Sequence, residues 1–215
     1  MFVLSGSRIT ITFLRIKFVK RHHRLFQLPK IYDFQVKLLK IINMVKIEDI
    51  DFHIKGKKVL DVGCGPNSFF FSPDKTNFCV GMDISEKFVR FAQKGNTNRQ
   101  RFIIGDAGNM PFKCGSFQVV VMLFTIHHIA LDHKMILEEA VRCCTEKIII
   151  VDHLQDESGF RRIIKSLWWK IKDKGYKYNT YDEWKKLFEP YHVTKEIITG
   201  GPLKNIYQVI ISLNK

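Results

Sequence analysis

Short runs of β-favouring residues alternate with longer amphipathic segments between residues 59 and 152. Each run is rich in valine, isoleucine or phenylalanine, and most of the runs end at an aspartate or a glycine. We expect strands over residues 57–63, 77–83, 101–106, 117–124 and 146–152. Helices are expected over residues 86–94, capped by Ser85, and over residues 133–144, begun by Asp132. This alternation is typical of βαβ units, which build a parallel sheet.

The apolar pattern changes after residue 152. Residues 159–172 carry apolar side chains at positions 160, 163, 164, 167, 168 and 171. This is a helical stripe, and it predicts a buried Trp168 and a Trp169 that stands among basic residues. A shorter helix is expected over residues 180–188, with Trp184 facing inward.

The last two β runs, residues 191–199 and 205–213, flank a Gly-Gly-Pro turn and predict a hairpin. The two strands of a hairpin are antiparallel, so the parallel sheet should end in an antiparallel edge. Right-handed crossovers bring the carboxyl ends of the parallel strands to one edge, where open α/β sheets bind ligands.

The formal net charge of +14 is distributed unevenly along the 215 residues. Residues 1–58 hold 13 Lys/Arg against 4 Asp/Glu, residues 59–154 hold 10 against 10, and residues 155–215 hold 12 against 7. This basic excess suits an anionic partner such as nucleic acid or a lipid head group, although solvated basic faces are common.

The cysteines and the N-terminal segment bear on the compartment. The five cysteines include no CxxC pair, which argues against a zinc site and a disulfide framework, so we expect no metal and a cytoplasmic location. Residues 1–20 are fairly apolar, but Arg8, Arg15 and Lys17 interrupt them. They fit neither a signal peptide nor a membrane span, and an interfacial anchor is left open.

A glycine pair follows the first predicted strand in the stretch VLDVGCGPN, residues 59–67. Gly63 and Gly65 would let a ligand approach the backbone, because a Cβ there would occupy the space. Asp83, at the end of the second strand, is placed to accept hydrogen bonds from two ribose hydroxyls. A GxGxxG dinucleotide motif is not completed, since Ser68 stands at the third glycine position. After the third strand, Asp106 can accept a hydrogen bond from an adenine amino group.

With these three loops in order, the sequence resembles the class I S-adenosylmethionine-dependent methyltransferases, in particular the branch of the ubiquinone and menaquinone biosynthesis enzymes. The stretches VLDVGCGPN, VGMDIS, GDAGNMPFKCGSFQVVV and LFTIHHI carry the resemblance, which covers residues 55–153 well. It implies a Rossmann-like fold with a mostly parallel seven-stranded sheet and helices on both faces. It also implies S-adenosyl-L-methionine as cofactor, bound by Asp61, Gly63, Cys64, Gly65, Asp83, Ile84, Asp106, Ala107, Phe124 and Thr125.

Two features depart from the family pattern. Asn67 replaces the usual third glycine, which would shift the methionine-binding loop slightly. The stretch RCCTEKIII lacks the usual Lys-Pro-Gly-Gly turn before the fifth strand, which shortens a loop remote from the cofactor.

Candidate catalytic residues stand just beyond the fourth and fifth predicted strands. Methyl transfer is an in-line displacement, so a base is needed only if the acceptor is protonated. His127 and His128, together with Asp152 and His153, are the candidates, and an imidazole is a suitable base at neutral pH. Adjacent strand residues point to opposite sides, so we expect at most one of His127 and His128 to face the acceptor. Purely structural roles for these histidines are the competing interpretation.

The resemblance also predicts how the acceptor site is covered. We expect residues 1–54 to be a basic extension with lid helices and residues 55–215 to be the cofactor-binding domain, with a lid insertion over 155–190. The candidate lining residues are Tyr32, Phe34, Trp169 and Tyr176. Their basic surroundings would tolerate an anionic substrate.

The sequence therefore predicts a methyltransferase acting on a small molecule through oxygen, nitrogen or carbon. An RNA methyltransferase is favoured only by charge, because residues 123–129 lack the Asn/Asp-Pro-Pro-Tyr/Phe motif. A non-catalytic cofactor-binding scaffold or activator subunit would carry the same cofactor motifs. A nicotinamide oxidoreductase is disfavoured by the incomplete GxGxxG motif and the antiparallel closing hairpin. Peripheral membrane contact is left open.

Overall fold

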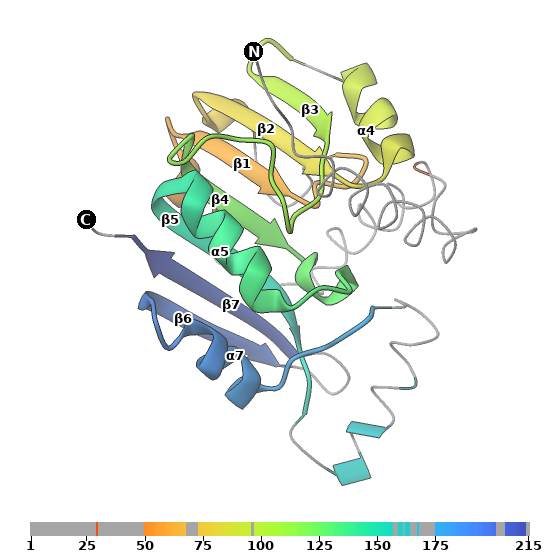
Figure 1. The fold of residues 1–215 in the computed structure, drawn as a ribbon, viewed down its shortest axis with the longest axis vertical. Coiled ribbons are helices and arrows are strands. Elements are labelled where there is room, and N and C mark those ends of the chain that lie inside the picture. Colours follow the sequence, from red (N-terminus) through yellow and green to blue (C-terminus); the bar gives the residue numbers. More distant parts are fainter. Residues whose placement is uncertain are drawn as a thin grey trace, which may run out of the picture.

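The computed structural model describes residues 29, 50–67, 73–95, 97–156, 159–160, 162–163, 167, 175–200 and 205–213. These residues build a seven-stranded sheet of order β3-β2-β1-β4-β5-β7-β6 (Figure 1). The first five strands are mutually parallel, and β7 is antiparallel to both β5 and β6. The predicted Rossmann-like α/β fold with an antiparallel C-terminal hairpin is confirmed.

The strands lie close to their predicted positions. They are β1 (Lys58–Val62), β2 (Phe78–Asp83), β3 (Gln100–Ile104), β4 (Phe117–Leu123), β5 (Cys144–Leu154), β6 (His192–Gly200) and β7 (Asn205–Ser212). The prediction was too short for β5, because β7 pairs with it from Lys147 to Leu154 and extends it. Asp152 and His153 therefore lie inside β5 and not beyond it.

Most helices begin at the residues that the sequence marks. They are α3 (Ile50–Ile54), α4 (Glu86–Ala92), α5 (His133–Cys143) and α7 (Tyr181–Phe188), with 3-10 turns η1 (Pro73–Lys75), η2 (Gln93–Gly95) and η3 (Ile126–His128). Ser85 caps α4 and Asp132 caps α5 through side-chain oxygens that accept backbone N–H bonds. Thr180 and Glu183 form a capping box at the start of α7.

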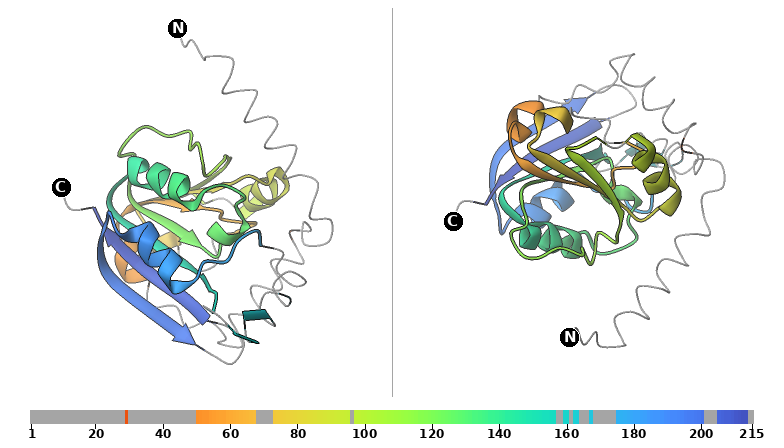
Figure 2. Two further views of the ribbon diagram at one scale, coloured as in Figure 1. Left: turned by 60° about the horizontal axis from the view of Figure 1, so that its bottom comes forward. Right: turned by 90° about the horizontal axis from the view of Figure 1, so that it is seen from above.

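Helices cover both faces of the sheet (Figure 2). On one face, Ile50 and Ile54 of α3 pack on the odd-numbered side chains of the central strands, such as Val119 and Ile149. Phe102 of β3 pairs with Gly81 on this same face and packs against α4. On the other face, α5 and α7 bury the even-numbered side chains, and Trp184 is buried there as predicted.

The predicted apolar stripe over residues 159–172 is not buried where it is described. Phe160, Ile163 and Leu167 have helical backbone and are 75%, 58% and 56% exposed. An amphipathic pattern does not say what its apolar face meets, and these three side chains of the stripe face solvent. Trp168 and Trp169 lie outside the described residues.

The chain leaves the sheet after Gln155 at the end of β5 and returns to the same place at Asn179 and Thr180. The N–H of Gln155 donates to the carbonyl of Asn179 at 2.9 Å, and Gln155 forms a parallel bridge with Thr180. The predicted boundaries at residues 54, 155 and 190 stay predictions. No helix in the described part of the chain has the length and apolarity needed to cross a bilayer.

Candidate functional site

The loop after β1 has a backbone that only glycine adopts easily. Gly63 and Gly65 have φ angles of 73° and 61°, in the left-handed region. A Cβ on Gly63 would lie 2.2 Å from Cγ2 of Thr125, so no side chain fits there. The N–H groups of Gly63 and Cys64 donate to the carbonyl of Met82, at 2.7 and 3.2 Å, and fold the loop over the end of β2.

Asp83 ties this loop to the end of β2. Its Oδ2 accepts the N–H of Gly65 at 2.9 Å, and its Oδ1 accepts the N–H of Ser85 at 2.8 Å. Burial raises the pKa of Asp83, and the two backbone N–H groups and nearby His128 oppose that rise. Each carboxylate oxygen has two lone pairs and can therefore accept a further hydrogen bond. Ile84, the next residue, is half-buried.

The turn after β3 fixes the second acidic residue. Oδ1 of Asp106 accepts the N–H of Gly108 at 2.8 Å, and its carbonyl accepts the N–H of Asn109 at 3.1 Å. These bonds form a tight turn that holds the half-buried carboxylate at the carboxyl end of the strand. Ala107 is buried against the core.

Two further cofactor candidates adjoin the bare loop, Asp61 just before it in β1 and Cys64 within it. Asp61 is 3% exposed and stands in β1 between β2 and β4. Burial, together with the charges of Asp83 and Asp61, raises the pKa of the Cys64 thiol well above its usual value. Cys64 therefore behaves as a packing residue and not as a nucleophile.

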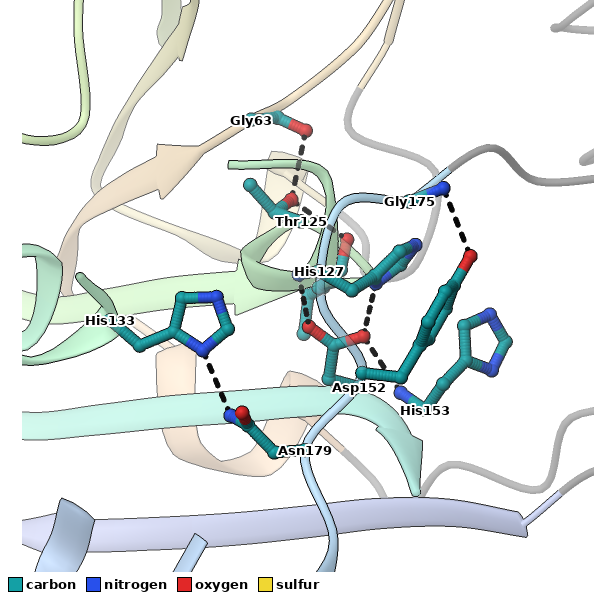
Figure 3. Close-up of polar contacts among 10 residues, drawn as sticks. Gly63, Thr125, His127, His133, Asp152, His153, Gly175 and Asn179 are labelled. Carbon is teal, nitrogen blue, oxygen red and sulfur yellow. Dashed lines mark hydrogen bonds and ion pairs between the residues drawn. The ribbon is translucent and has the colours of Figure 1, made fainter. Parts of the chain in front are cut away.

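The chain turns sharply after β4, where Phe124 and Thr125 lie. Phe124 has a φ of 53°, an unusual value for a residue with a side chain, and its N–H donates to Val151 at 2.7 Å. Such strained backbone often marks a functional site. The Thr125 hydroxyl donates to the carbonyl of Leu123 at 3.1 Å and lies 3.4 Å from that of Gly63 (Figure 3). The ends of β1 and β4 are thereby joined.

His127 and Asp152 form a buried pair next to this turn. The ring Nδ1 of His127 is hydrogen-bonded to Oδ1 of Asp152, and the His127 N–H donates to Oδ2 at 3.1 Å (Figure 3). The N–H of His153 donates to Oδ1 at 2.7 Å. Burial alone would raise the pKa of Asp152, but attraction to His127 and these hydrogen bonds outweigh it and hold that pKa below its usual value.

The two adjacent histidines lie in the 3-10 turn η3 and not in a strand. The argument from alternating strand side chains therefore does not apply to them. Their rings are 4.0 Å apart, centroid to centroid, with His127 buried and His128 half-buried. The ring of His153 is 4.9 Å from that of His127 and 5.3 Å from that of Phe124.

A short segment within the predicted lid insertion covers His127. The ring of Tyr178 stacks on it at 5.1 Å and 20°. The N–H groups of Tyr176 and Lys177 approach the His127 carbonyl at 2.7 and 3.3 Å. The N–H of Gly175 donates to the Tyr178 hydroxyl at 3.0 Å, and a Cβ on Gly175 would lie 2.6 Å from that oxygen (Figure 3).

The structure thus brings the four catalytic candidates together at the ends of β4 and β5. Among the lining candidates, Tyr176 is 42% exposed and contacts His127 through its backbone. Tyr32, Phe34 and Trp169 lie outside the described residues. Sequence reasoning missed Tyr178, because no motif marks it and only the folded segment places its ring on His127.

Comparison with known proteins agrees with this arrangement. Residues 60–150 match a family model described as a methyltransferase domain. An uncharacterized methyltransferase, YcgJ of Bacillus subtilis, is 30% identical over 108 residues, which are 46% of this chain and 42% of that protein. Ajmaline N-methyltransferase of Rauvolfia serpentina is 32% identical over 109 residues, 46% of this chain and 37% of that protein. Demethylmenaquinone methyltransferase of Staphylococcus haemolyticus is 30% identical over 99 residues, 43% of this chain and 41% of that protein.

The match therefore spans less than half the length of each of these curated relatives. The crystal structure of YcgJ superposes with a TM-score of 0.65 at 15% identity, over 77% of this chain and 97% of that one. Magnesium protoporphyrin IX methyltransferase of Synechocystis, with bound S-adenosylhomocysteine, gives a TM-score of 0.60 at 14% identity over 95% of both chains. At these identities the superpositions show the fold. Residues 60–150 thus match a methyltransferase-domain model, in agreement with the resemblance that the sequence motifs indicated.

Proposed function

We propose that the protein transfers a methyl group from S-adenosyl-L-methionine to a small-molecule acceptor through an oxygen, nitrogen or carbon nucleophile. One observation carries this proposal. The carboxylate of Asp83 joins the bare glycine loop after β1 to the end of β2, with each oxygen still able to accept a ribose hydroxyl. The relatives named for ajmaline and demethylmenaquinone support a small-molecule acceptor.

The residues present suit the cofactor. Gly63 and Gly65 offer backbone without side chains to its methionine part, with Asp61 and Cys64 beneath them. Asp106 and Ala107, in the turn after β3, would hold the adenine. Thr125, held against Gly63, closes the region behind the sulfonium together with Phe124. When bound, the cofactor supplies an electrophilic methyl group.

The chain's own contribution is to hold the acceptor in line and exclude water. Since Asp152 is held ionised, it only accepts hydrogen bonds, and the shared proton lies on Nδ1 of His127. In a neutral ring the lone pair is then on Nε2, which is buried in the present structure beside the stacked ring of Tyr178, so a hydroxyl or amine acceptor would reach this nitrogen only after that segment shifts. Asp152 acts through His127 as a positioning residue, and it stabilises the imidazolium that forms. His128 and His153 flank the pair and complete the proposed acceptor side.

Direct binding tests the donor half of this proposal. Calorimetric titration with S-adenosylhomocysteine, run beside NADH, should give micromolar affinity for the first and none for the second. Binding of NADH alone would replace the proposal by an oxidoreductase, and binding of neither would refute a competent cofactor site.

The acceptor half is tested by methyl transfer from radiolabelled donor to pools of small molecules and, separately, to RNA. Label in RNA alone would favour an RNA methyltransferase. Binding without transfer to either would favour a scaffold or activator subunit. His128→Ala and His127→Gln should be compared across pH 6 to 9, because loss of the proton acceptor changes the pH profile and not only the rate.

The proposed location is the cytoplasm. All five cysteines are free thiols, and four of them are buried. Reduced, unpaired cysteines are typical of proteins in a reducing compartment.

A further inference from the structure

Three large apolar side chains stand in solvent on the insertion that follows β5. Phe160, Ile163 and Leu167 are each more than half exposed, at 75%, 58% and 56%. Their backbone is helical, and spacings of three and four residues place them on one face. Scattered exposed leucines need no explanation, but three large apolar side chains exposed at helical spacing do. We call these three side chains the exposed apolar face.

The exposed apolar face lies away from the sheet. The insertion is anchored at its base, where Gln155 pairs with Asn179 and Thr180 at the end of β5. The described pieces of residues 159–167 lie beyond that end of β5 (Figure 1). The face is therefore presented on the same side of the protein as the carboxyl ends of the parallel strands.

The charge of the segment that carries this face indicates which kind of partner it binds. Residues 159–174 contain six Lys/Arg and one Asp, and Arg162 is exposed on the same turn as Ile163. Residues 1–58 are also basic, with 13 Lys/Arg against 4 Asp/Glu, so like charges oppose their docking on this segment. Nucleic acid would satisfy the charge but leave the aliphatic side chains of the face in water.

A bilayer surface with anionic head groups satisfies both features. A helix with phenylalanine, isoleucine and leucine on one face and lysine and arginine elsewhere binds in the plane of such a surface, with its apolar face at the acyl boundary. Basic residues beside it add attraction to the negative surface potential. We propose that the exposed apolar face docks the protein on anionic lipid bilayers. This inference is independent of the proposed methyl transfer.

Vesicle sedimentation of the full chain tests the proposal. Vesicles of phosphatidylcholine alone are compared with vesicles that also contain phosphatidylglycerol, at low and high salt and without cofactor. The triple variant Phe160→Ser, Ile163→Ser, Leu167→Ser should bind the anionic vesicles at least about tenfold more weakly than wild type, because it lacks the buried apolar area. Phe52→Ser is the matched control, since Phe52 is also 75% exposed but lies on α3, and it should bind as wild type does.

Each other outcome overturns the proposal. If the triple variant binds anionic vesicles as strongly as the wild type does, the exposed apolar face does not make the contact. If the wild type binds neutral vesicles as strongly as anionic ones, the anionic head group is not recognised. If the wild type binds no vesicles but binds polyuridylate, and the triple variant loses that binding, the face belongs to an RNA site. If the wild type binds no vesicles but forms a dimer that the triple variant loses, the face contacts a second copy of the chain. Thermal unfolding and S-adenosylhomocysteine titration of the triple variant show that it is folded, and they separate a failure here from a failure of the proposed function.

Discussion

Asp83→Asn is the sharpest test of the cofactor site. The substitution keeps the shape of the side chain, but it replaces two acceptor oxygens by one oxygen and one NH2 group. In the present structure the two oxygens accept the N–H groups of Gly65 and Ser85, at 2.9 and 2.8 Å. The NH2 group of the asparagine must therefore face one of these two backbone N–H groups, where neither group can accept a hydrogen bond. The variant also loses one acceptor for a ribose hydroxyl.

The expected loss follows from the charge of the group that is removed. A hydrogen bond to an ionised group contributes about 1.5 to 3 kcal/mol, so losing one and weakening another should cost about 2 to 3 kcal/mol of binding free energy. That corresponds to a dissociation constant for S-adenosylhomocysteine raised by about 30- to 150-fold. Burial raises the pKa of Asp83, so its negative charge costs folding free energy at neutral pH. The variant loses this cost as well as a hydrogen bond, and we expect its ligand-free unfolding temperature to change little.

Calorimetry at several pH values checks the reasoning. In the wild type, affinity should fall as pH is lowered toward the raised pKa of Asp83 and the carboxylate takes up a proton. In Asp83→Asn this part of the pH dependence should be absent. Asp74→Asn, which removes the same charge from an exposed position in η1, is the control and should bind normally. Unchanged affinity in Asp83→Asn would refute its assignment to the ribose.

The remaining predictions concern stability. Gly63→Ala should abolish S-adenosylhomocysteine binding and lower the unfolding free energy by more than Gly56→Ala, because its Cβ would lie 2.2 Å from Thr125, whereas Gly56 has a similar φ of 68° and open space. Gly56→Ala should cost only the backbone strain, about 1 to 2 kcal/mol in urea unfolding, and equal losses would contradict the clash. Tyr178→Phe should cost about 1 kcal/mol, since it keeps the stacked ring and loses one hydrogen bond to a backbone N–H. The lowered pKa of Asp152 means that its charge stabilises the fold above about pH 4. In urea unfolding at pH 7, the free energy of unfolding of the wild type should therefore be larger than that of Asp152→Asn. This difference should disappear as the pH falls below 4. A constant difference from pH 7 to pH 3 would count against stabilisation by the ionised carboxylate of Asp152.

The sequence predicted the sheet well because its strands are short and buried, and because most of them end at an aspartate or a glycine. Val119 and Val121 face one layer of helices and Val120 and Met122 the other, so the whole run of β4 is apolar and stands out. The ends of β5 were placed less well. Its length depends on pairing with β7 across the chain, and no local pattern records such a long-range partner.

The turns proposed for the cofactor could be located from the sequence because each one follows a strand and uses a residue type with a clear physical role. The acceptor side could not be predicted as fully. The pairing of His127 with Asp152 joins residues 25 positions apart through a 3-10 turn, and the stacking of Tyr178 depends on a segment that returns after a long excursion. For the same reason the sequence could not show what the exposed apolar face contacts, since periodicity shows a stripe but not its partner.

The pairing of Gln155 with Asn179 and Thr180 separates two tasks within one chain. Everything between these residues leaves and returns at the end of β5, so its sequence and length can change without moving a strand of the sheet. The proposed donor site at β1 to β3 is then insulated from changes in the excursion. A lineage built on this plan can change the proposed acceptor site by exchanging one loop, while it inherits the proposed donor site intact.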